Sequence, residues 1–123
     1  MNIKKTIAER LLADTEIAEI VGSSIYRDRL PKTLKPPHII VWQTGKNRIY
    51  NHDGYSGLTE SDIQISCFSH DPDEADNIAE LVKGSLESWT QVEDCFFEGE
   101  TNIFEEDTLV YHVALEAKIS YHE

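Results

Sequence analysis

The sequence has few cysteines, no long apolar segment and little positive charge. Its two cysteines, Cys67 and Cys95, are too few for a disulfide framework and stand in no Cys/His spacing that is typical of zinc sites. The longest strictly apolar run, Ile39–Trp42, falls far short of the roughly 20 residues that a membrane-spanning helix needs. The first residues lead into an amphipathic pattern rather than a signal peptide. We therefore expect a protein that is made in a cytoplasm and has no membrane partner.

Acidic residues dominate the charge. The chain has 11 lysines and arginines against 23 aspartates and glutamates, a formal net charge of −12. This balance argues against direct attraction to a phosphate backbone, because nucleic-acid-binding proteins normally carry a basic stripe. It suits a solvated surface, or one that repels something negative. With 123 residues and 40% hydrophobic content, the chain is large enough for one core, so we expect a single domain over residues 1–123.

Helical patterns stand at the start and in the middle of the chain. Over residues 2–13 the apolar positions recur every three or four residues, and a second short pattern runs from Ile17 to Val21 between a capping Asp14 and Gly22. The segment Asp71–Glu74 then combines an N-cap aspartate, a proline at the first helical position and a glutamate at the third. The apolar stripe that follows predicts one long helix, about 73–90, packed across a sheet.

The remaining segments are β-rich. Ile25 and Tyr26 suggest a short edge strand, followed by a loop with Pro31, Pro36 and Pro37. Further strands are predicted from enrichment in β-branched and aromatic residues and from alternation, at 38–43, 59–69, 92–103 and 108–121. Residues 48–50 either extend the first of these strands or begin the loop that follows it. Two strand pairs with a helix between them indicate an α+β fold. We expect an antiparallel or mixed sheet of about four to five strands, with an N-terminal helical region and the helices on one face.

A polar stretch, residues 45–57, separates two of the predicted strands. It contains the turn residues Asn51, Asp53 and Gly54, so we expect a long exposed hairpin loop. Tyrosines at exposed loop tips are typical of protein interfaces, and the stretch is locally basic in an acidic chain. We therefore predict that it meets an acidic surface on a neighbouring subunit. The candidate interface residues are Lys46, Arg48, Tyr50, His52, Asp53 and Tyr55.

Possible chemical sites have simpler explanations. The acids of His70–Glu74 stand where a helix start favours negative charge, so we read them as a cap rather than a metal site. Adjacent residues in a flexible loop, such as Asn51–Asp53, rarely hold the geometry that proton transfer requires. His112 falls on the polar face of the last strand near Glu116, where a histidine–carboxylate contact is an ordinary surface feature. We predict no catalytic, metal or cofactor site.

The order of these features resembles a known family, the tail completion or tail terminator proteins that join the tail tube to the head connector in long-tailed bacteriophages and prophages. The resemblance covers nearly the whole chain and depends on an ordered set of short segments rather than on one motif. The segments are Val21–Tyr26, Pro37–Val41, Asp53–Leu58, Ile63–Phe68, Glu74–Ala75 with Ile78–Ala79 and Val82, and Tyr111–Ala117.

The resemblance implies a structural virion protein of the tail or neck, synthesised in a bacterial host, that is not an enzyme. Its implied partners are further copies in a six-fold ring, the tail-tube protein and the head connector or stopper protein. DNA would pass through the lumen only as cargo, and negative charge there would repel the duplex so that it slides. Residues 45–57 match a hairpin loop that is mobile in the free subunit and ordered in the ring.

Two other readings stay open at this stage. One is a related neck or head-closure protein, which binding to the major tail-tube subunit would distinguish. The other is a small cytoplasmic enzyme or ligand-binding domain. A compact pocket with converging polar groups and a histidine of shifted pKa would favour that second reading.

Overall fold

The fold is seen in a computed structural model, which describes residues 1–28 and 35–123. Pro31, which the sequence suggests as part of a loop, lies outside the described residues. Helices and strands follow the chain in the order α1 (Ile3–Leu12), α2 (Thr15–Val21), β1 (Ile25–Arg27), β2 (His38–Asn51), β3 (Gly54–Ser69), α3 (Pro72–Glu87), β4 (Asp94–Glu105) and β5 (Val110–His122). No helix in the described part of the chain is long and apolar enough to cross a membrane.

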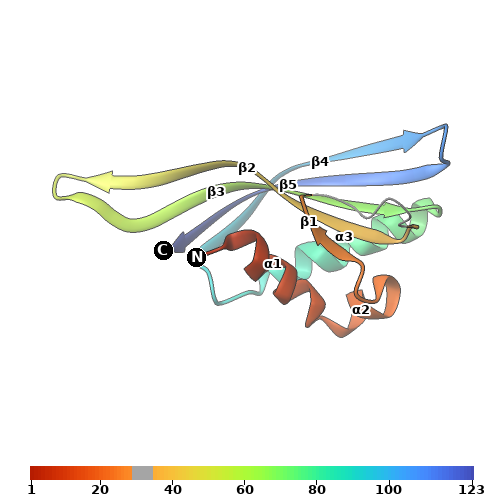
Figure 1. Cartoon of the computed structure of the whole chain (residues 1–123), viewed down its shortest axis with the longest axis horizontal. Helices are drawn as coiled ribbons and strands as arrows, with labels where there is room; N and C mark the ends of the chain where they lie inside the picture. Colours follow the sequence, from red (N-terminus) through yellow and green to blue (C-terminus); the bar gives the residue numbers. More distant parts are fainter. Residues whose placement is uncertain (29–34) are drawn as a thin grey trace.

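The strands form one mixed, five-stranded sheet, so the α+β class is confirmed. Their order is β1-β2-β3-β5-β4, with β1 parallel to β2 and every other pair antiparallel. The helices lie on one face of this sheet (Figure 1), and α3 contacts both β3 and β5. Between helices and sheet lies one apolar core, whose largest fully buried side chains include Ile7, Leu11, Ile39, Ile65, Ile78 and Leu115.

The helix boundaries follow from the capping signals. The side chain of Asp14 accepts hydrogen bonds from the backbone N–H groups of Glu16 and Ile17, and Gly22 ends α2 with φ +61°. Asp71 caps α3 by accepting from the N–H of Asp73. Each cap satisfies donors that a helix start leaves without partners.

The third position of α3 is used differently from a simple capping box. Glu74 accepts from the hydroxyl of Ser69 at 2.8 Å, and that Ser69 oxygen accepts from the backbone N–H of Asp71 at 3.1 Å. The serine therefore relays the contact that the glutamate would otherwise make directly. At its other end α3 stops at Glu87, short of the predicted 90, because the N–H of Trp89 turns to the carbonyl of Leu86 in a tighter turn.

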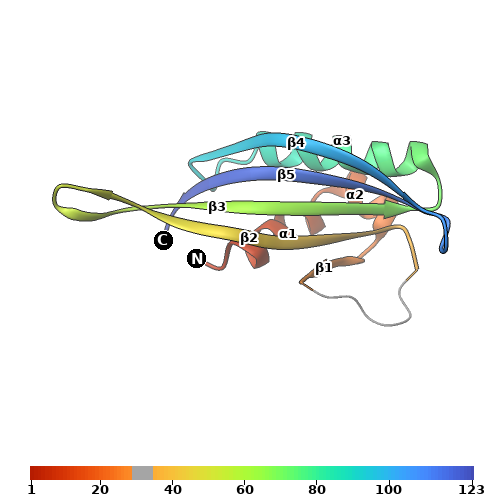
Figure 2. The same cartoon turned by 90° about the horizontal axis from the view of Figure 1, so that it is seen from above.

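The predicted loop at 45–57 is wrong: this segment is paired strand. Strands β2 and β3 pair from His38 with Phe68 out to Asn51 with Gly54, and only a tight turn joins them. Because β5 pairs with β3 only from Leu58 onward, the end of the β2–β3 pair projects beyond the sheet (Figure 2). We call residues 45–57 the ribbon. With water on both faces, the ribbon lacks the alternation of apolar and polar residues that marks a half-buried strand.

The face of the sheet that bears no helix carries a row of rings. His38, Phe68 and His112 are register partners on β2, β3 and β5, and their rings stack with centroids 4.6 Å and 4.2 Å apart. The expectation of a surface contact between His112 and Glu116 is therefore wrong, since the His112 ring is half-buried against Phe68. Strand β5 begins at Val110 rather than at the predicted residue 108, which leaves Leu109 exposed in the preceding turn.

Candidate protein interface on the ribbon

All the candidate interface residues lie on or beside the ribbon. Lys46, Arg48 and Tyr50 belong to β2, His52 and Asp53 form the turn, and Tyr55 belongs to β3. Strand pairing brings some of these side chains together and separates others. Arg48, Tyr50 and Tyr55 form one cluster, Lys46 makes a separate ion pair at the ribbon base, and the turn residues extend into solvent.

In this cluster the Tyr55 ring is held against the sheet and the Tyr50 ring is exposed to solvent. The guanidinium carbon of Arg48 lies 4.7 Å from the centroid of the Tyr55 ring, and the Tyr50 ring is tilted against Tyr55 with centroids 5.8 Å apart. The Tyr55 hydroxyl lies 2.6 Å from the hydroxyl of Thr59, which is buried, so this ring is directed back along β3. Tyr50, whose side chain lies beside Arg48, is 63% exposed. The cluster thus presents an aromatic ring beside a cation, a combination enriched at protein interfaces.

The turn does not form a catalytic pair. The side chain of Asn51 accepts a hydrogen bond from the backbone N–H of Asp53 at 2.9 Å, which closes the turn, and Gly54 follows with φ +108°. His52 is exposed and makes no hydrogen bond or ion pair with any described residue. A general base needs a partner that orients the imidazole, and the turn places none there.

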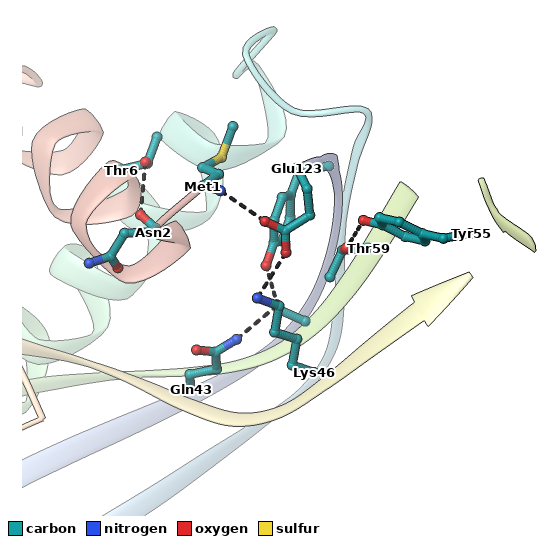
Figure 3. Close-up of polar contacts among 10 residues, drawn as sticks. Met1, Asn2, Thr6, Gln43, Lys46, Tyr55, Thr59 and Glu123 are labelled. Atoms are coloured by element: carbon teal, nitrogen blue, oxygen red, sulfur yellow. Dashed lines mark hydrogen bonds and ion pairs between the residues drawn. The ribbon is translucent and has the colours of Figure 1, made fainter. Parts of the chain in front are cut away.

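Ion pairs hold the base of the ribbon to both ends of the described chain. The carboxylate of Glu123 lies 2.8 Å from Nζ of Lys46 and 2.9 Å from the amino group of Met1 (Figure 3). The hydrogen bond from Lys46, and then that from Met1, lowers the pKa of Glu123 to about 2. The same contact raises the pKa of Lys46. Sequence reasoning missed Glu123, because no local signal indicates that it approaches a lysine on β2.

Beneath this ion pair a chain of side-chain hydrogen bonds joins β2, β3 and β5. The Gln43 amide donates to the Ser61 hydroxyl at 3.0 Å, and the Ser61 oxygen lies 2.8 Å from the hydroxyl of Tyr121, which is 1% exposed. A buried hydroxyl needs such partners, since an unsatisfied one would destabilise the fold. The three strands are therefore held in register where the ribbon leaves the sheet.

Both the sequence and the fold are similar to those of known proteins. The sequence matches the family described as Tail completion protein gp17 over residues 5–122. The chain belongs to this tail completion family. Its fold is similar to that of a chain in a structure titled "Virion of native gene transfer agent (GTA) particle", with a TM-score of 0.73 and 16% sequence identity, covering 95% of this chain and 92% of that chain. Among curated proteins, none matches the sequence.

Membership of the tail completion family gives the chain a structural role in phage tails and confirms the resemblance drawn from its sequence.

Away from the ribbon, a cleft of about 280 Å³ lies between the start of α3 and strands β4 and β5. Its lining is largely apolar and includes Ala75, Phe104 and Val113. In the part of the chain that the structure describes, no three His, Cys, Asp or Glu side chains are grouped so that they could hold a metal ion.

The thiol groups of both cysteines are unreactive near neutral pH. Cys67 is buried and Cys95 is half-buried, and neither forms a disulfide. Burial raises the pKa of Cys67 above its usual value and that of Cys95 to about 11. Both thiols are therefore protonated near neutral pH, where a thiolate would be needed for nucleophilic attack or metal binding.

Proposed function

We propose that this chain caps the phage tail tube and joins it to the head connector, acting as a ring of identical subunits that contact one another through the ribbon. The observation that carries the proposal is the ribbon itself in a chain of the tail completion family. A paired ribbon that projects from the sheet has no core of its own to bury. Its exposed Tyr50 beside Arg48 is best explained by a partner surface.

The proposed partners are copies of this chain, the tail-tube protein on one side of the ring and the head connector or stopper protein on the other. DNA would pass through the lumen as cargo, repelled by a surface that reflects the net charge of −12. A ring of this kind should bury on the order of 2,000 Å² or more at each subunit's contacts. The ribbon increases the area available for such contacts at little cost in chain length.

The ribbon would enter this assembly already formed. Its strands are paired to the turn, and the ion pairs of Glu123 and the buried Ser61–Tyr121 contact hold its base. A preorganised surface loses less conformational entropy on binding than a loop that must fold. Under this proposal residues 45–57 are already ordered in the free subunit, whereas the sequence resemblance implied a loop that becomes ordered only in the ring.

Light scattering of the purified protein over a range of concentrations tests the proposal, with and without the tail-tube protein. We expect either a closed hexamer or a smaller species that joins the tube protein. A monomer that ignores the tube protein at every concentration would contradict the proposal. Binding to the connector but not to the tube would instead indicate a head-closure role.

The enzyme or ligand-binding alternative receives less support. The cleft beside α3 is lined mainly by apolar groups, and the ring of His112, whose pKa burial lowers, stacks on Phe68 instead of meeting a carboxylate. Asp76, Asn102 and Tyr111 line the cleft together with His112, but the buried Nε2 atom of that histidine has no hydrogen-bond partner among the described residues.

A further inference from the structure

The cleft beside α3 lies at the end of the molecule opposite the ribbon. Strand β3 runs from the turn of the ribbon at Gly54 to Ser69, just before α3 begins at Pro72. Because a strand rises about 3.3 Å per residue, its 16 residues place roughly 50 Å between the tip of the ribbon and the cleft. The ribbon and the start of α3 also lie at opposite ends in Figure 2. The ribbon of a subunit therefore cannot fill that subunit's own cleft.

The cleft has apolar walls on the helix-bearing side of the sheet. Register places Phe104 opposite Tyr111, on the same side of the sheet as Val113, which belongs to the core. The rings of Phe104 and Tyr111 have centroids 4.6 Å apart, and Phe104 is 44% exposed. Ala75 and Asp76 of α3 form the opposite wall. At about 280 Å³ the cleft is smaller than most small-molecule sites, and it suits one inserted aromatic side chain.

The turn between β4 and β5 adds exposed apolar surface next to the cleft. Leu109 is 62% exposed and has φ +57°, a conformation that residues other than glycine seldom adopt. Its carbonyl oxygen lies 3.1 Å from Nδ1 of His70, in the segment that leads into α3. The turn is thus held beside the start of α3, with a large apolar side chain in water. Such a surface is typical of a protein interface.

The charges of the cleft and of the ribbon are complementary. The segments that line the cleft, residues 69–82 and 101–117, contain no lysine or arginine. Neither Asp76 in the cleft nor Arg48 on the ribbon makes an ion pair with any described residue. The guanidinium of Arg48 lies over the Tyr55 ring and beside the exposed Tyr50. A cation beside an aromatic ring at one end of the molecule therefore matches an acidic, apolar cleft at the other.

The twist of the sheet allows the two surfaces to meet. Arg48 pairs with the buried Thr59, and Thr59 pairs with Tyr121 of the core, so Arg48 continues the helix-bearing side onto the ribbon. Because a sheet twists with one hand, its two ends are rotated in opposite senses from its middle. In Figure 1 the strands overlap in the middle, whereas β2 lies above β3 in the ribbon and β4 lies above β5 at the other end. The two surfaces thus turn towards opposite edges of the sheet, as a head-to-tail contact requires.

We propose that the ribbon of one copy docks in the cleft beside α3 of the next copy, with the Tyr50 ring against Phe104 and the guanidinium of Arg48 facing Asp76. This inference rests on the proposed self-assembly and names the surface that receives the tip of the ribbon. The aromatic ring supplies buried apolar area, and the ion pair selects the surface that the ring enters. Two different surfaces meet in this contact, so it closes into a ring when the rotation between copies allows it.

Exchanging the two charges tests the docking. Arg48→Glu and Asp76→Arg, each alone, place like charges at the contact and should weaken association by about tenfold or more. A chain that carries both substitutions restores an opposite pair and should associate within about threefold of the wild type. The matched control Glu87→Arg makes the same change in charge on an exposed residue at the other end of α3, and it should assemble like the wild type.

Cross-linking of the two surfaces gives an independent measurement. Tyr50→Cys combined with Asn102→Cys should form a disulfide between copies when the assembled protein is oxidised, because Asn102 lines the cleft. Peptide mass spectrometry identifies the joined positions, and the two single substitutions reveal any bond to the native cysteines. The neighbouring Thr101 is exposed on the other face of the sheet, so Tyr50→Cys with Thr101→Cys should stay unlinked.

Light scattering and native mass spectrometry measure association, with the tail-tube protein present if the wild type requires it, and thermal unfolding confirms that each variant is folded. If the wild type assembles but the single charge variants assemble equally well, or positions 50 and 102 stay unlinked, docking in the cleft is wrong and the proposed function stands. A double charge variant as weak as the single ones, or a control that loses assembly as they do, also overturns the docking. A wild type that neither self-associates nor joins the tube overturns the proposed function as well.

Discussion

Replacing His112 by phenylalanine should remove part of the acid sensitivity of this fold. The His112 imidazole stacks on Phe68, and its Nε2 atom is buried without a hydrogen-bond partner among the described residues. Burial lowers the pKa of His112, because the charged ring would lose its water, while the carboxylate of Glu105 opposes this weakly. The pKa of His38, on the other side of Phe68, is lowered by burial too, and the backbone of Lys35 opposes that shift. Neither ring nitrogen of His38 has a hydrogen-bond partner of good geometry among the described residues.

The coupling between proton binding and folding gives both the direction and the largest possible size of this change in the free energy of unfolding. In the unfolded chain the histidine pKa is about 6.5, so between that value and the lower folded pKa the unfolded state binds more protons. The stability that comes from keeping this histidine neutral is therefore fully present above about pH 7.5 and is lost as the pH drops through this window. At about pH 5.5, an imidazole that stayed neutral in the fold would reduce the free energy of unfolding by about 1.4 kcal/mol. Because the His112 ring is only half-buried, solvent screening reduces its share below this ceiling.

Urea unfolding of the wild type and His112→Phe at about pH 7.5 and 5.5 measures the effect, since the slope of stability with pH reports bound protons. Phenylalanine keeps the stack on Phe68 and cannot be protonated. Comparing the two proteins at each pH cancels the titration of the carboxylates that they share. The variant should gain stability relative to the wild type on acidification, by up to about 1 kcal/mol. An equal difference at both pH values would refute the reasoning.

Substitutions at three further positions test the interface, a buried hydrogen bond and a helix cap. Tyr50→Ala should change the free energy of unfolding by no more than about 0.5 kcal/mol and weaken assembly tenfold or more, measured by thermal unfolding and light scattering; a large loss of monomer stability would place Tyr50 in the core. Tyr121→Phe should cost about 1–2 kcal/mol in urea unfolding, because Ser61 loses its buried partner, and an unchanged midpoint would show that this contact contributes nothing. Asp71→Ala should cost about 1 kcal/mol by removing the cap on the Asp73 N–H, whereas Asp71→Asn should retain most of it; equal losses would argue against capping.

Local patterns predicted the helices because the information for them is local. The Asp71–Glu74 start signal and the apolar stripe of α3 lie within one segment, and the caps at Asp14 and Gly22 act on their own helix. Their periodicity survives because one face of each helix is buried and the other is wet. The strands with one packed face, such as 59–69, were predicted for the same reason.

The ribbon and the row of rings were mispredicted because they depend on pairing. Residues 45–57 have turn-like composition, and only the partner strand shows that they are extended. His112 was assigned to a wet face because alternation cannot tell that Phe68 and His38 lie beside it on other strands. Neighbours on a sheet are set by the register of strands far apart in sequence.

The sequence by itself determined the α+β class, most element boundaries and the acidic net charge. Only the tertiary structure decided that Lys46 meets Glu123 and that Ser61 and Tyr121 share a buried hydrogen bond. Helix caps and hydrophobic periodicity act over a few residues, whereas strand order and register emerge only when the whole sheet closes over a common core.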